Sequence, residues 1–112
     1  MKFNGIVTLY NTVEVDFKKT LVPRLLEGVY VEKTRGAEKA AEGDKNADNL
    51  LLIVPFSGHN GVSFVVGDLI AVGDTGEADS FAELTARAET FRIASVKTYD
   101  FGVLKHWEVI AK

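Results

Sequence analysis

The feature that most limits the possible folds is an unbroken run of apolar residues from Leu50 to Phe56. A helix that spans a bilayer needs about 20 apolar residues, so this run is far too short for one. Pro55 near its end also disfavours a buried helix. The run is bounded by Asn49 and by the turn-forming residues 57–58. The pattern therefore predicts a central strand that is covered on both faces.

The residues before this run also favour strands. Residues 6–10 are rich in β-branched and aromatic side chains, and residues 13–17 alternate apolar with polar. The alternation places three side chains on one face of the pleat: Val13, Val15 and Phe17. We expect a hairpin turn at residues 11–12 between these strands. A third strand is predicted over residues 24–33 after Pro23, with Leu25, Glu27, Val29 and Val31 on one face and Leu26, Gly28 and Tyr30 on the other.

Short strands continue towards the C-terminus. Residues 64–74 are expected to hold two strand pieces around a Gly-Asp turn or bulge. Ser80, with Glu83 three residues on, predicts a capped short helix in which Phe81, Leu84 and Ala88 share one face. Residues 91–98 and 106–111 predict a terminal hairpin around residues 100–102. The fold class is therefore mainly β: a small antiparallel β-barrel or sandwich of about seven short strands with one short helix.

Residues 34–49 differ from the rest because they contain no large apolar side chain. We predict a single β-barrel domain over residues 1–112 in which residues 34–49 form a long exposed loop or arm. Such a loop is a candidate interface or channel loop that orders only against a partner. Its charged residues are the candidate contacts: Arg35, Glu38, Lys39, Glu42, Asp44 and Lys45.

The charge is unevenly distributed along the chain. Overall there are 13 basic and 16 acidic residues, a net charge of −3 with a pI near 5.3. Residues 74–89 are strongly acidic, whereas residues 90–112 carry a net positive charge. Two regions of opposite charge suit head-to-tail contact between identical subunits, although simple solvation of the surface is the commoner explanation. The candidate acidic contact patch consists of Asp74, Glu77, Asp79 and Glu83.

The sequence offers little for catalysis or for cofactors. The absence of Cys excludes disulfides, thiolate metal sites and a Cys nucleophile. His59 lies in a predicted turn and His106 beside Trp107, and their spacing does not predict a metal site. Residues 74–79 resemble a calcium loop only faintly, because Gly76 falls at the third position instead of the sixth. We expect no enzymatic activity, no metal and no cofactor.

Four segments, in this order along the chain, resemble a family of short virion proteins from the head–tail module of tailed phages and prophages of Gram-positive bacteria. They are Val7-Thr8-Leu9-Tyr10-Asn11, then Leu25-Leu26-Glu27-Gly28-Val29-Tyr30, then Ile53-Val54-Pro55-Phe56 with residues 64–73, and finally Asp100-Phe101-Gly102 with His106-Trp107-Glu108-Val109. The resemblance covers nearly the whole chain and implies a small β-barrel of the head-completion, or stopper, type without enzymatic activity.

The resemblance also implies a place and partners. Such proteins form a homo-oligomeric ring of about 6 or 12 copies in the virion neck, between the portal–adaptor assembly and the tail. A stopper helps to retain packaged DNA, so the channel loop is expected to contact DNA. The protein would be made in the cytoplasm of the bacterial host. The related tail-completion (terminator) ring proteins are similar in size and remain an alternative.

A second alternative is a monomeric oligonucleotide-binding barrel. Five aromatic side chains could stack on bases: Tyr10, Phe17, Tyr30, Phe64 and Trp107. Most of them fall in phase with aliphatic residues, which indicates core positions instead. The negative net charge also argues against a groove that follows phosphates. No apolar stretch is long enough for a membrane helix, so no membrane partner is expected.

Overall fold

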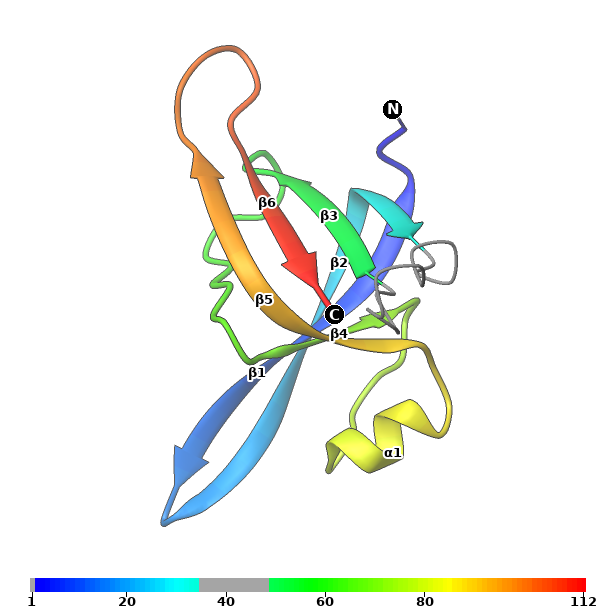
Figure 1. Cartoon of the computed structure of the whole chain (residues 1–112). Helices are drawn as coiled ribbons and strands as arrows, with labels where there is room; N and C mark the ends of the chain where they lie inside the picture. The colour runs from blue at the N-terminus through cyan, green and yellow to red at the C-terminus, as the bar shows by residue number, and fades with distance from the viewer. Residues whose placement is uncertain (1, 35–48) are drawn as a thin grey trace, which may run out of the picture.

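The chain forms a closed antiparallel β-barrel, seen in a computed structural model that describes residues 2–34 and 49–112 (Figure 1). The strands follow one another around the barrel in the order β1-β2-β3-β6-β5-β4. One short helix, α1, lies between β4 and β5. The elements are β1 (Gly5–Val15), β2 (Lys18–Thr34), β3 (Asn49–Pro55), β4 (Leu69–Val72), α1 (Phe81–Thr85), β5 (Thr90–Tyr99) and β6 (His106–Ala111). The predicted class, a small mainly β barrel with a single short helix, is confirmed, with six strands in the described residues.

The apolar run at residues 50–56 forms the predicted central strand. β3 pairs with β2 on one side and with β6 on the other. Leu50, Leu52 and Val54 are fully buried in the barrel core, and Ile53 is buried as well. The predicted terminal hairpin is also confirmed, because β5 pairs with β6 along most of its length. Burial of these aliphatic side chains stabilises the barrel by about 1.5–3 kcal/mol for each one.

The first hairpin differs from its prediction in where it turns. β1 runs straight through Asn11 and Thr12, which pair with Val22 and Leu21 of β2. The turn lies instead at Asp16 and Phe17, which have φ angles of 54° and 64°. Two consecutive residues with positive φ match the twist of a two-residue hairpin loop, although an aromatic residue rarely adopts that conformation.

Because the turn comes later, the hairpin is longer than predicted, and the side chains near its tip are exposed. Phe17 is 97% exposed at the tip, and Val13 and Val15 are about half exposed. Their alternating pattern is real, but the strands that carry them extend beyond the barrel (Figure 1). The predicted strand over residues 13–17 is therefore correct as far as Val15, whereas Phe17 belongs to the turn.

A β-bulge at Gly28 changes the buried face of β2. Gly5 of β1 pairs with Val29, whereas Ile6 pairs with Glu27, so Gly28 is left without a partner. Its φ of 72° is one that glycine adopts without strain. Leu26 and Val29 are consequently both buried, three residues apart. The two uninterrupted faces predicted for residues 24–33 were wrong for this reason.

The segment before α1 contains less strand than predicted. Only residues 69–72 of the expected pair of strand pieces form a strand, and residues 64–68 form a loop that ends in a turn. Ser80 caps α1 as expected, because its Oγ accepts a hydrogen bond from the Glu83 N–H. Leu84 is buried, but Phe81 is 43% exposed and lies under the Arg92 guanidinium, so the predicted apolar helix face is incomplete.

We predict that truncating a valine to alanine lowers the free energy of unfolding inside the barrel but hardly changes it outside. Val54→Ala removes a fully buried side chain and should lower the free energy of unfolding by about 2 kcal/mol. Val15→Ala, at a strand position beyond the barrel, should change it by less than about 0.5 kcal/mol. Urea denaturation followed by circular dichroism measures both. Equal losses from the two variants would contradict the exposed placement of Val15.

Candidate interaction surface

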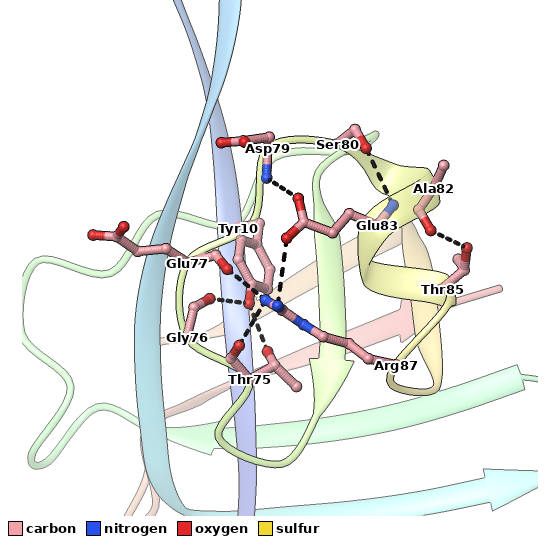
Figure 2. A network of polar contacts seen from close by, with 10 residues as sticks. All are labelled: Tyr10, Thr75, Gly76, Glu77, Asp79, Ser80, Ala82, Glu83, Thr85 and Arg87. Atoms are coloured by element: carbon pink, nitrogen blue, oxygen red, sulfur yellow. Dashed lines mark hydrogen bonds and ion pairs between the residues drawn. The ribbon is translucent and has the colours of Figure 1, made fainter.

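The acidic loop between β4 and α1, residues 73–80, is fastened to β1 by side chains. Thr8 Oγ1 donates a hydrogen bond to the Gly73 carbonyl at 2.7 Å and accepts one from the Thr75 N–H at 3.1 Å. The buried Tyr10 hydroxyl donates to the Gly76 carbonyl and lies 2.6 Å from Thr75 Oγ1 (Figure 2). Beyond the backbone hydrogen bond from the Gly73 N–H to the Ile6 carbonyl, the side chains of two residues of one strand therefore fix the path of the loop.

The other side of the loop is held by α1 (Figure 2). The Glu83 carboxylate accepts a hydrogen bond from the Asp79 N–H at 2.9 Å and lies 3.4 Å from the Arg87 guanidinium. Arg87 also donates to the carbonyl oxygens of Thr75, at 2.8 Å, and of Glu77. The guanidinium thus replaces water at two loop carbonyls that no strand partner satisfies.

The four carboxylates of the predicted acidic contact patch do not all face the same surface. The Glu83 carboxylate turns toward the loop itself, where it accepts a hydrogen bond from the Asp79 N–H and pairs with Arg87. The side chains of Glu77 and Asp79 point outward and line a groove of about 560 Å³, whose other wall is the β2 segment from Lys18 to Pro23. Asp74 is exposed but does not line this groove. Two of the four predicted carboxylates therefore face the same concave surface.

The groove exists because the β1–β2 hairpin projects from the barrel. We call residues 13–22 the arm. At the base of the arm, other side chains cover the strand edges: Arg24 donates to the Asn60 carbonyl at 2.7 Å, and Asn11 donates to the Ser63 carbonyl and to Asp68, both at 2.9 Å. Beyond these contacts, the strands of the arm pair only with each other among the described strands. Backbone edges of this kind are available to a partner.

Exposed apolar side chains also gather in the loop that joins β5 and β6, residues 100–105. Phe101 is 71% exposed, Val103 is fully exposed and Leu104 is about half exposed. Figure 1 shows this loop at the end of the barrel opposite to the arm and α1. Clusters of exposed apolar side chains on a small domain commonly mark contact surfaces.

The two histidines have structural contacts. His59 is buried, and its ring nitrogens lie 2.8 Å from the Pro55 carbonyl and 2.7 Å from the Glu27 carbonyl, so it ties its turn to β2. The His106 ring stacks on Tyr99 at 4.8 Å between centroids. Within residues 2–34 and 49–112, no group of three or more His, Cys, Asp or Glu side chains is placed to hold a metal ion.

A raised pKa is found at Tyr30 of β2, away from the acidic loop. The Tyr30 hydroxyl donates a hydrogen bond to the Glu32 carboxylate at 2.8 Å. This bond, with some desolvation and the carboxylate's negative charge, raises the pKa of Tyr30 above its ordinary value. Both residues lie on β2, beyond the bulge, and do not border the groove.

The aromatic residues considered for base stacking have different environments. Tyr10 is fully buried, and Phe64 and Trp107 pack against the barrel core and each other, with ring centroids 5.5 Å apart. Tyr30 is half-buried. Phe17 is almost fully exposed and is thus an exception to the core positions expected for most of the five. The described aromatic side chains therefore do not form one continuous stacking face.

The predicted channel loop lies almost entirely outside the described residues. Thr34 and Asn49, its expected ends, are paired with each other as the last residue of β2 and the first of β3. The candidate contacts Arg35, Glu38, Lys39, Glu42, Asp44 and Lys45 all fall in the segment 35–48, which the structure does not describe.

Fold and surface together define a small closed β-barrel with a projecting two-stranded arm and, beside the arm, a groove lined by both basic and acidic side chains. The chain belongs to DUF6751, a family of unknown function, whose model matches residues 2–112. A comparison with curated proteins found no match, and neither did a comparison with solved structures. In the part of the chain that the structure describes, no helix has the length and apolar character needed to cross a membrane.

The groove itself was missed by sequence reasoning. Its position depends on how far β1 and β2 extend past β4 and β3, and no single residue encodes that length. One signal was available: Lys18 and Lys19 follow directly on the apolar alternation of residues 13–17, and lysines are common on exposed strand edges.

We predict that the buried Tyr10 hydroxyl stabilises the acidic loop. Tyr10→Phe leaves the Gly76 carbonyl without its donor and should lower the free energy of unfolding by about 1–2 kcal/mol, with faster amide hydrogen exchange in residues 73–80. Tyr99→Phe is the matched control, because its ring makes stacking contacts that phenylalanine retains. Unchanged exchange in the Tyr10 variant would show that the loop is held by other contacts.

Proposed function

We propose that this chain is a structural protein of the phage neck, a head-completion ring subunit that joins the portal–adaptor assembly to the tail and helps to retain packaged DNA. The resemblance of four segments to such virion proteins supports this proposal, and the small β-barrel is the fold that the resemblance implies. The proposed site of action is the virion neck, and the proposed partners are further copies of the chain, portal or adaptor proteins, and tail proteins.

The observation that carries the proposal is the pair of uncovered apolar surfaces at opposite ends of the barrel. The arm exposes Phe17 and Val15, and the β5–β6 loop exposes Phe101 and Val103. A domain of this size gains stability when such side chains are buried by neighbours. A subunit with unlike contact surfaces on two sides can form a ring with copies of itself, whereas a monomer leaves both surfaces in water.

Two other functions remain as outcomes of the test. A tail-completion ring protein would use the same two-sided contacts at the tail end of the neck. A monomeric oligonucleotide-binding barrel would bind single-stranded DNA with an affinity that falls as salt increases. The aromatic environments described above favour the ring proposals, because Tyr10 is inaccessible to a base.

The decisive experiment is assembly on a portal. We expect the purified chain to form a ring when mixed with a portal–adaptor complex of a tailed phage, as seen by native mass spectrometry and negative-stain electron microscopy. A ring bound to the portal supports head completion, and a ring bound only to tail tubes supports the terminator alternative. A monomer that ignores both and binds DNA in a salt-dependent manner would refute the neck proposal.

Two variants test whether the exposed apolar surfaces take part in ring formation. Phe17→Ser and Phe101→Ser should each reduce ring formation at least tenfold while changing the free energy of unfolding by less than about 0.5 kcal/mol. Val65→Ser is the matched control, because Val65 is half exposed and lies outside both surfaces. Normal assembly by the two Phe variants would mean that these surfaces do not contribute to the ring.

A further inference from the structure

His59 holds the turn that follows β3 against β2, at the place where these two strands separate. The pairing of β3 with β2 ends at Ile53 and Tyr30. Beyond that point the His59 ring lies between the two strands: Nδ1 is 2.8 Å from the Pro55 carbonyl oxygen, and Nε2 is 2.7 Å from the Glu27 carbonyl oxygen. One buried side chain therefore joins β2 and β3 where their backbones no longer pair.

Both partners of the His59 ring can only accept hydrogen bonds. A hydrogen bond at each ring nitrogen therefore requires a proton on each nitrogen. A neutral imidazole has a single N–H and would turn a lone pair towards the second carbonyl oxygen at hydrogen-bond distance. Rotating the ring by a half-turn would place C–H groups at both positions and lose both bonds. Only the charged imidazolium form makes the two contacts together.

The charged side chains on β1 and β2 near this ring do not neutralise it. Glu27 offers its backbone carbonyl to the ring, and its side chain is exposed. Arg24 donates to the Asn60 carbonyl at 2.7 Å, so it holds the same turn through a second contact. β1, which pairs with this part of β2, has no charged residue before Glu14.

On the other side of the turn, the neighbouring titratable groups are also cationic. Lys105 accepts a hydrogen bond from the Phe56 N–H through its carbonyl, and His106 pairs with Pro55. Within residues 2–34 and 49–112, no carboxylate is in ion-pair contact with His59. Burial alone disfavours the imidazolium, whereas two charge-assisted hydrogen bonds to carbonyl oxygens favour it.

We infer that His59 is a pH-sensitive contact, in which the imidazolium form fastens the turn at residues 57–61 to β2 and loss of one proton breaks one of its two hydrogen bonds. The stabilisation is present at low pH and is lost as the pH rises and the folded protein releases that proton. The Arg24 contact stays charged throughout. Because β2 continues from here into the arm, the proton on His59 controls how firmly the base of the arm is held. This inference does not depend on the proposed ring function.

The protonation state can be measured directly, because the chain has only two histidines. Long-range proton–nitrogen NMR spectra report whether each ring nitrogen carries a proton, and His106→Gln assigns the signals. We expect both His59 nitrogens to be protonated in most molecules at pH 7, whereas a histidine in water is only about one-quarter protonated at that pH. A single protonated nitrogen in most molecules would overturn the inference.

Hydrogen exchange measures the release of the turn. The His59 N–H donates to the Phe56 carbonyl at 3.0 Å, and the Val62 N–H donates to the His59 carbonyl at 3.4 Å. We expect the protection factors of these two amides, corrected for the intrinsic effect of pH on exchange, to fall about threefold or more between pH 6 and pH 8.

His106→Gln is the matched control and should keep this fall in protection. His59→Gln should abolish it, because glutamine does not titrate. A fall of equal size in His59→Gln, or no fall in the unaltered chain, would overturn the inference. The NMR measurement and the pH series on the unaltered chain decide the matter even if His59→Gln does not fold.

Discussion

The architecture depends on a mismatch in strand length. β1 has 11 residues and β2 has 17, whereas β4 has only 4, and β3 pairs with only the last five residues of β2. A barrel can close only where every strand has two neighbours. The part of the hairpin beyond that ring of neighbours must leave the barrel. The arm, its open edges and the grooves beside it all follow from this difference in strand length.

Polar side chains, and not strand pairing, hold most of the acidic loop between β4 and α1 in place. Thr8 and Tyr10 satisfy the carbonyls of Gly73 and Gly76, and Arg87 satisfies two more from the helix side. The loop is therefore fixed in shape although it is neither helix nor strand. Outward-facing carboxylates on a fixed loop lose little conformational entropy when a cationic partner binds. The outward-facing carboxylates are thus pre-organised by Thr8, Tyr10 and Arg87, with Glu83 holding the Asp79 N–H.

Some of this fold could be predicted from the sequence, and the failures have specific causes. The central strand, the terminal hairpin and the Ser80 cap each depend on a local pattern, and all three were predicted correctly. The turn at Asp16 and Phe17 was missed because it lacks the glycine that usually marks positive φ. The change of face at Gly28 was missed because a bulge depends on the pairing between strands: Val29 pairs with Gly5 of β1 and Glu27 with Ile6, and no pattern within β2 shows this.

The candidate surface was predicted only in part, for a similar reason. A run of carboxylates between residues 74 and 83 is visible in the sequence, but the separation of Glu83 from Glu77 and Asp79 depends on the geometry of the cap. The groove depends on the projection of the arm, which is a property of two strands compared with their neighbours. A residue pattern within one segment does not show how long a strand is relative to its neighbours.

The closure of the barrel also has a consequence for the order of folding. β1 and β2 are joined by a tight turn, so their pairing is local and can form within microseconds. The seam between β1 and β4 joins residues as far apart as Thr8 and Gly73, 65 positions along the chain. Contacts of such long range make folding slow. During synthesis, the first hairpin therefore waits with both edges unpaired until the strands that complete the barrel have been made, and Lys18 and Lys19 at its tip would discourage association with other chains during that interval.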